Sequence, residues 1–365
     1  MDERRGMRQD DGVSRRSLVG GVIALIIGGG LYNGLHRTLR VAGAQAMQAV
    51  RTALPRASRT LPAIPPDPAT VHPGLSPLIT PAKDFYRVAT TFDVPGFDPA
   101  TWRLTVDGLV RKPLTLTWDQ LIARPVIEVD AMLACVSNAV GGSLVGNARW
   151  LGVRLDDLVR EAEPEQKADQ VMGWSSDGFS AGFPLAALDG RDAIIAIGMN
   201  GAPLPPEHGY PARLVVPGLY GYVSATKWLK RIELTRLDYE QGYWVPRGWA
   251  QIAPIKTESR IDTPKDGADL KPGTRAIAGV AWSPPRGIAK VEVQVDDGPW
   301  RTATLGPELA TTTWRQWWIA WDAPAGDHTL TVRATDGTGV TQTKVVQGEV
   351  PDGATGWHRI AVHVV

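Results

Sequence analysis

The sequence predicts two folded domains, a mixed α+β domain followed by an all-β sandwich. Helix and strand patterns are mixed up to about residue 255, and only short, regularly spaced strand patterns follow. A length of 365 residues is enough for two separate cores. The 39 glycines and 29 prolines fit a protein of many strands and turns.

In the first domain, predicted over residues 82–255, residues 102–106 alternate like a strand and Asp107-Gly108 predicts a turn. Thr117 is the expected cap of a short helix over 116–122. One apolar face predicts a second helix over 153–162. Apolar runs predict buried strands at 193–198 and 213–216.

The second domain, predicted over residues 256–365, consists of short alternating segments with turn signals such as Asp297-Gly298 between them. This pattern predicts an immunoglobulin-like sandwich. The predicted strands are 276–282, 291–295, 317–321, 330–334 and 360–364. The tryptophans expected to fill the core are Trp282, Trp300 and Trp321. Three further tryptophans, expected to face a partner subunit or the neighbouring domain, are Trp314, Trp317 and Trp318.

The first 50 residues are predicted to be a twin-arginine-type signal or a membrane anchor. Arg15-Arg16 precedes an apolar stretch over 20–32, which is shorter than the ~20 residues of a spanning helix. We therefore expect export across the cytoplasmic membrane. Ala42-Gly43-Ala44 is a candidate cleavage site, and cleavage or retention as a membrane tether both stay open. Residues 51–81, rich in Pro, Ala and Arg, are expected to be a linker.

Charge and cysteine content exclude several classes of protein and site. Lys and Arg number 39 against 38 acidic residues, so no strong positive field would recruit nucleic acid. With Cys135 as the single cysteine, an intramolecular disulfide, a cysteine-rich zinc site, a cysteine-ligated iron–sulfur cluster and paired-cysteine haem attachment are impossible.

Cys135 stands where an apolar run ends and a loop with Ser137, Asn138 and Gly141-Gly142 begins. A thiol at the start of such a loop can be held rigidly and still be reached. The alternative is a small buried hydrophobic residue, the usual state of a lone cysteine. A cysteine hydrolase would need a base, and His208 is the best of six histidines that form no recognisable pattern.

The motifs around this thiol are Cys135-Val136-Ser137-Asn138, Gly141-Gly142, residues 145–152, 198–205, 207–213 and 216–218, and Lys227-Trp228. In this order they resemble the molybdenum-binding core of the sulfite oxidase family. Residues 279–282 and 291–293 resemble the family's immunoglobulin-like dimerisation domain. The resemblance extends from about residue 78 to the end of the sequence.

The resemblance implies a mononuclear molybdenum held by one molybdopterin and by the Cys135 thiolate, a soft donor that suits the metal. The implied cofactor-binding residues are Tyr86, Asn138, Asp177, His208, Arg213, Ser224, Thr226 and Lys227. Arg213 can form a bidentate pair with the pterin phosphate, and Lys227 can add a point charge. Arg87, Arg149 and Phe179 are assigned to the catalytic site with Cys135. The alternatives are a salt bridge for Arg149 and a turn for Asp177.

The implied function is two-electron oxygen-atom transfer on a small oxyanion such as sulfite, or the reverse reduction of an S-oxide or N-oxide. Electrons would pass to or from a separate cytochrome, because Leu75 after His72-Pro73-Gly74 departs from a haem-ligating run and no haem is expected in this chain. A homodimer through the sandwich is also implied. From a different class, a cofactor-free envelope module for binding or adhesion remains the alternative.

Two departures from the family bear on the substrate. Animal and plant sulfite oxidases carry arginine shortly after the ligand cysteine, where this chain has Ala139 and Val140. They also place a tyrosine beside the metal, where this chain has Phe179. We therefore expect poor oxidation of sulfite.

Overall fold

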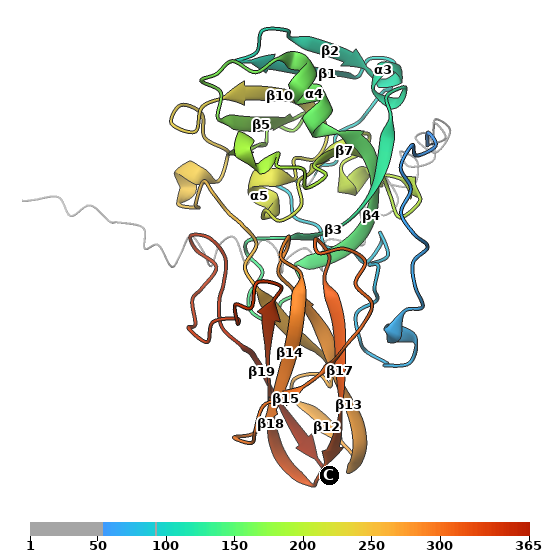
Figure 1. The fold of residues 1–365 in the computed structure, drawn as a ribbon, viewed down its shortest axis with the longest axis vertical. Coiled ribbons are helices and arrows are strands. Elements are labelled where there is room, and N and C mark those ends of the chain that lie inside the picture. The colour runs from blue at the N-terminus through green and yellow to red at the C-terminus, as the bar shows by residue number, and fades with distance from the viewer. Residues whose placement is uncertain (1–53, 92) are drawn as a thin grey trace, which may run out of the picture. The chain divides into compact units, whose positions relative to one another are not determined.

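Figure 1 shows the computed structural model, which describes residues 54–91 and 93–365. The predicted signal or anchor, residues 1–50, and the first residues of the predicted linker lie outside the described part of the chain. Among the described residues, no helix combines the length and apolar character needed to cross a bilayer.

The first domain contains two five-stranded sheets and three short α-helices. One sheet has the order β2 (Leu114–Thr117), β1 (Arg103–Gly108), β10 (Leu229–Thr235), β5 (Gln170–Ser175) and β6 (Ser180–Pro184). The other has β3 (Val126–Ala134), β4 (Val145–Arg154), β7 (Ile194–Met199) and β8 (Ala202–Pro203), with β9 (Arg213–Val215) also paired to β7. The α-helices are α3 (Trp118–Ile122), α4 (Leu155–Ala162) and α5 (Gly221–Ser224), and 3-10 turns cover Pro68–Thr70, Leu185–Ala187, Pro206–His208 and Val245–Arg247.

Local sequence explains where these helices begin. Thr117 Oγ1 accepts from Gln120 N at 3.2 Å, and Gln120 Oε1 accepts from Thr117 N at 2.8 Å, a reciprocal capping box at the start of α3. The predicted Thr117 cap is confirmed. The second predicted helix begins at Leu155 rather than at Val153, because Val153 pairs within the sheet.

The turn predicted at Asp107-Gly108 is wrong. Both residues belong to β1, where they pair in parallel with Glu233 and Leu234 of β10. A Cβ on Gly108 would lie 2.3 Å from the carbonyl oxygen of Leu234. The glycine therefore marks a close approach of two strands, as well as a positive φ of 85°.

The second domain is the expected sandwich of two sheets. One has the order β11 (Glu258–Thr263), β13 (Gly273–Trp282), β17 (Arg315–Ala323) and β16 (Thr304–Leu305). The other has β12 (Ala268–Leu270), β19 (His358–Val364), β18 (Gly326–Asp336), β14 (Ile288–Val295) and β15 (Arg301–Thr302). The five predicted strands fall within β13, β14, β17, β18 and β19.

The tryptophans are distributed differently from the prediction. Trp317 and Trp321 lie in the sandwich core with exposed fractions of 0% and 4%. Trp282, expected in the sandwich core, is buried instead among the core residues of the first domain. Trp314 is buried there as well, which agrees with the expectation that it faces the neighbouring domain. Trp300 is only half-buried, and the guanidinium of Arg333 lies 4.1 Å from its ring centroid. These tryptophans therefore join the two domains as well as filling the sandwich.

Residues 54–81, expected to be a linker, are hydrogen-bonded to both domains, and we call them the N-terminal strap. Ser58 N donates to Val126 O at 2.8 Å in the first domain. Asp67 Oδ1 in the strap accepts from Nε2 of Gln316 in the sandwich at 2.8 Å. Trp318, expected to face a partner subunit or the neighbouring domain, lies with its ring 5.0 Å from that of His72 in the strap.

Candidate active site

Cys135 directly follows β3, and hydrogen bonds fix the main chain around it. Its amide N donates to Leu144 O at 2.9 Å, and Asn138 N donates to Cys135 O at 3.0 Å. The residue as a whole keeps partial exposure. Burial raises the pKa of the Cys135 thiol, although hydrogen bonds from Ser137 act in the opposite direction. A bound metal ion would favour the thiolate form at this position.

Arg213 in β9 is a buried cation without a counter-charge. It is 5% exposed, and in the described part of the chain its partners are main-chain carbonyls rather than carboxylates. Its guanidinium donates to His208 O at 3.1 Å and to Ala225 O at 3.2 Å. Burial lowers the pKa of Arg213 to about 10. A charge in such surroundings is costly unless an anion joins it.

Tyr86 connects the thiol with this cation. Burial and the Cys135 thiolate raise the pKa of Tyr86, whereas Arg213 lowers it. The electrostatic effects of both groups indicate that the hydroxyl lies near each of them. A Cβ on Gly221, the first residue of α5, would lie 3.6 Å from Tyr86 Oη and from Ala134 O. The end of β3, the start of α5 and Tyr86 therefore meet; β3 and α5 are labelled in Figure 1.

His208 and Lys227 extend the group. His208 is 1% exposed and its Nε2 donates to Ala82 O at 2.8 Å; burial, more than the repulsion from Arg213, lowers its pKa to about 4. Lys227 Nζ donates to Glu207 O at 3.3 Å. Burial and the charge of Arg213 lower the pKa of Lys227 to about 8. The cations are thus close enough to repel one another.

An ion pair lies at the exposed side of this group. Arg87 Nη2 lies 2.7 Å from Glu207 Oε1, with side chains 46% and 30% exposed. Asp177 accepts from Phe179 N at 3.0 Å, and its charge partly offsets the lowering of the Lys227 pKa. The two acids attenuate the positive charge around Arg87 and Lys227.

Comparisons with known proteins agree with this geometry. The model of the oxidoreductase molybdopterin binding domain matches residues 91–244, and that of the bacterial Ig domain matches residues 258–332. Over 342 residues the chain is 30% identical to human mitochondrial sulfite oxidase, covering 78% of this chain and 62% of that protein. It is 35% identical over 165 residues to YuiH of Bacillus subtilis, an uncharacterized oxidoreductase, and covers 80% of it. The chain belongs to the sulfite oxidase-like family of molybdopterin-dependent oxidoreductases.

A solved structure supports the fold of the family. The sulfane dehydrogenase SoxCD from Paracoccus pantotrophus matches with a TM-score of 0.66 and 25% identity, over 74% of this chain and 76% of that chain. These comparisons confirm the predicted family, the two-domain fold class and the molybdenum–molybdopterin cofactor. This chain spans 62% of the length of the human and mouse sulfite oxidases.

The donors of the site fit a molybdopterin cofactor. In the described part of the chain, no three His, Cys, Asp or Glu side chains are arranged to hold a metal ion by themselves. A dithiolene from the pterin, together with the single thiolate, would supply soft donors that the protein otherwise lacks. A phosphate would neutralise Arg213 and Lys227. Both features match a metal carried by an anionic organic cofactor.

Two predicted oxyanion-binding arginines are already paired. Arg149 in β4 makes a bidentate contact with Asp130 in β3, with Nε–Oδ1 2.8 Å and Nη2–Oδ2 2.7 Å. Its Nη1 also donates to Pro62 O at 2.8 Å, so the contacts of Arg149 match the salt-bridge alternative, and its catalytic assignment stays a prediction. Arg87 remains near the site, but its guanidinium is engaged by Glu207.

Three predicted cofactor-binding side chains form hydrogen bonds within the protein. Ser224 Oγ donates to Tyr220 O at 2.9 Å, and Thr226 Oγ1 donates to Gly173 O at 3.3 Å. Asn138 Oδ1 accepts from Leu144 N at 2.8 Å, which closes the loop after Cys135. These buried hydrogen bonds support the loops, and direct contact of the three side chains with the cofactor stays a prediction.

Phe179 directly precedes β6, and its ring centroid is 5.9 Å from that of Tyr243. Residues that the sequence analysis did not assign are Glu207 and Tyr220. Glu207 precedes His208 in the family motif, which was a usable signal. Tyr220 is 2% exposed, and the Cys135 thiolate is among the causes that raise its pKa after burial; no pattern in the sequence pointed to it.

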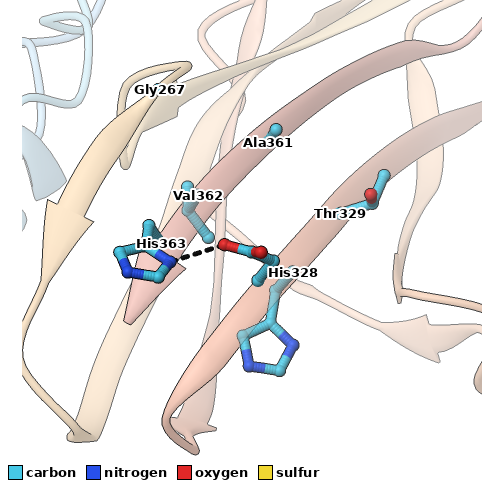
Figure 2. Close-up of a pocket in the computed structure, with 7 residues that line it drawn as sticks. Gly267, His328, Thr329, Ala361, Val362 and His363 are labelled. Carbon is cyan, nitrogen blue, oxygen red and sulfur yellow. Dashed lines mark hydrogen bonds and ion pairs between the residues drawn. The ribbon is translucent and has the colours of Figure 1, made fainter. Parts of the chain in front are cut away.

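Figure 2 shows a pocket at a different place, on the sandwich between β18 and β19. His363 Nδ1 contacts Asp327 in its wall. His328 Nδ1 lies 2.9 Å from Asp296 Oδ2, and its Nε2 lies 3.0 Å from Pro324 O. The pocket contains no residue of the cluster around Cys135, and its histidines already have partners.

Proposed function

We propose that the protein is an exported molybdenum enzyme that transfers an oxygen atom to or from a small oxyanion or S-oxide, while two electrons pass in the opposite direction. Cys135 would bind the metal, and Arg213 and Lys227 would hold the pterin phosphate. When bound, the cofactor supplies the two-electron chemistry, while the protein supplies binding, orientation and charge. The observation that carries the proposal is a partly exposed cysteine beside Tyr86 and Arg213, a buried cation that lacks a carboxylate partner in the described part of the chain.

The protonation states of the neighbouring side chains support this assignment. His208 is neutral at pH 7 and Tyr86 keeps its proton, because burial disfavours the charged form of each. Tyr86 can therefore donate a hydrogen bond towards a ligand between Cys135 and Arg213. Lys227, with its pKa lowered to about 8, gains most from an added anion near neutral pH.

For the substrate, we propose a small molecule other than sulfite. Ala139 and Val140 bring no charge to the loop, and Arg87 and Arg149 already have carboxylate partners. An incoming dianion would therefore meet fewer free cations at the described site than the residue types alone suggest. A screen that follows the redox state of molybdenum with sulfite, S-oxides and other oxyanions tests this; rapid turnover of sulfite would contradict it.

Partners and location complete the proposal. We propose a separate cytochrome as the electron partner, since Leu75 after His72-Pro73-Gly74 departs from a haem-ligating run. The twin arginine Arg15-Arg16 supports export, with cleavage or retention as a membrane tether as the two alternatives. Replacing both arginines by lysine should leave the protein in the cytoplasm, as measured by cell fractionation.

The test of the function is molybdenum and pterin analysis of the purified protein and of Cys135→Ser. Serine replaces a soft donor by a hard and poorly ionised one, so activity should disappear while much of the pterin remains bound. Ser143→Ala, at an exposed position of the same loop, is the matched control and should keep both metal and activity. Full activity of Cys135→Ser contradicts the assignment, and wild-type protein with neither metal nor pterin supports the binding module instead.

A further inference from the structure

The loop that follows Cys135 is contacted by the sandwich. Arg260 in β11 donates from Nη1 to Gly142 O at 2.7 Å. Glu258, in the same strand, accepts from Asn138 Nδ2 at 3.4 Å. Both contacts join residues more than a hundred positions apart in the sequence, and both fall on the loop that fixes the thiol.

Arg260 is itself firmly held. The residue is 9% exposed, its Nε lies 2.6 Å from Asp262 Oδ1, and its Nη2 donates to Ser76 Oγ at 2.8 Å. Asp262 Oδ2 in turn accepts from Ser76 N at 3.0 Å. One planar guanidinium therefore connects the sandwich, the N-terminal strap and the loop, which a lysine cannot do with a single ammonium group.

A second contact acts on the preceding residue. Gly141 has a φ of +78°, and a Cβ there would lie 2.2 Å from His358 Nε2 in β19. His358 Nδ1 accepts from Ile261 N at 2.9 Å, so the ring is fixed by the main chain of β11. The loop main chain thus passes between the first domain and a rigid face of the sandwich.

We propose that Arg260 is a positioning residue that acts on the Cys135 thiol across the domain boundary, through the carbonyl of Gly142. Cys135 N donates to the carbonyl of Leu144 at the other end of the loop, so the position of the loop is linked to the residue that carries the thiol. A small displacement of a reacting group lowers the rate strongly, so the orientation of this loop matters for the site. The inference rests on the proposed function only in taking Cys135 as the metal ligand.

The experiment uses the full chain without cofactor, in which Cys135 is the single thiol. Its alkylation rate by iodoacetamide is compared among wild type, Arg260→Lys and Arg315→Lys. Arg315 is the matched control, because it donates to Gly306 O and Ile288 O, both within the sandwich. We expect a severalfold faster alkylation in Arg260→Lys and no change in Arg315→Lys. Equal rates in the two variants would overturn the proposal.

Two additions keep the test decisive. If Arg260→Lys does not fold, Ser76→Ala removes one of its anchors and should shift the rate in the same direction by a smaller factor. In the loaded enzyme, the electron paramagnetic resonance signal of molybdenum should change in Arg260→Lys at unchanged metal content. A changed alkylation rate with an unchanged signal would support the positioning of the thiol and contradict its ligation to the metal, so the two hypotheses fail separately.

Discussion

Replacing Arg213 by glutamine should release the cofactor while leaving the free energy of unfolding of the cofactor-free protein nearly unchanged. Burial lowers the pKa of Arg213 from its ordinary value to about 10. At about 1.4 kcal/mol per pKa unit, the folded cofactor-free protein holds this cation at a cost of roughly 3 kcal/mol. Glutamine removes that cost and also the hydrogen bonds to three main-chain carbonyls, each worth about 1 kcal/mol. The two effects nearly cancel.

The loss of cofactor affinity in Arg213→Gln is not offset in this way. Two charge-assisted hydrogen bonds to a phosphate, at roughly 1.5–3 kcal/mol each, correspond to a loss of about 10²- to 10⁴-fold in affinity. The measurements are urea unfolding of the cofactor-free proteins and molybdenum and pterin content per folded protein. We expect an unfolding free energy close to wild type and little retained cofactor.

Arg149→Gln is the matched control with the opposite expectation. It leaves Asp130, whose side chain is 2% exposed, without its partner, so the protein should lose about 3–5 kcal/mol of stability. The cofactor content of its folded fraction should stay at the wild-type level. If Arg213→Gln instead kept its cofactor, or lost as much stability as Arg149→Gln, Arg213 would be a structural arginine and the reasoning would be refuted.

Three further predictions concern stability, substrate and assembly. Burial raises the pKa of Glu258 from 4.5 to about 8, so the folded protein retains a proton that the unfolded chain releases, and stability falls as the pH rises from about 4.5 to 8. Glu258→Gln should thus match wild type near pH 4 and exceed it by up to roughly 5 kcal/mol above pH 8; equal pH dependence of the two melting curves would contradict this. Phe179→Tyr should rescue sulfite turnover only slightly, because an arginine charge about 4 Å from the substrate is worth roughly 4 kcal/mol and remains missing. A large gain in kcat/KM for sulfite would show that the hydroxyl matters more than the missing charge. We expect a dimer formed through the sandwich, and light scattering at micromolar concentration should give the mass of a dimer. The mass of a monomer would contradict this expectation.

Features set by neighbouring residues could be read from the sequence. The cap of α3 needs only Thr117 and Gln120, which are three positions apart, and it was predicted. The short strands of the sandwich were recognised because alternation and turns are local patterns. Cys135 and Arg213 were found through motifs, and the structure gives Arg213 the buried, unneutralised environment that a phosphate site requires.

The partners of charged residues could not be read in this way. Asp130 lies opposite Arg149 only in the register of β3 and β4, and that register depends on how the loop between them closes. In the same way, the hydroxyl of Thr226 donates to the carbonyl oxygen of Gly173 in β5. Trp314 satisfies its indole N–H with Leu78 O in the N-terminal strap. Residue types identified these side chains as important, but only the tertiary structure decides what they contact.

The N-terminal strap limits where the chain can be processed during maturation. Ser58 already bonds to the start of β3, and Ser76 is an anchor of Arg260. A protease that removed residues beyond Ser58 would therefore strip a support from the first domain, and a cut beyond Ser76 would loosen the loop that bears Cys135. A signal peptidase acting at Ala42-Gly43-Ala44 would spare both contacts. The mature amino terminus compatible with an intact site thus lies upstream of Ser58.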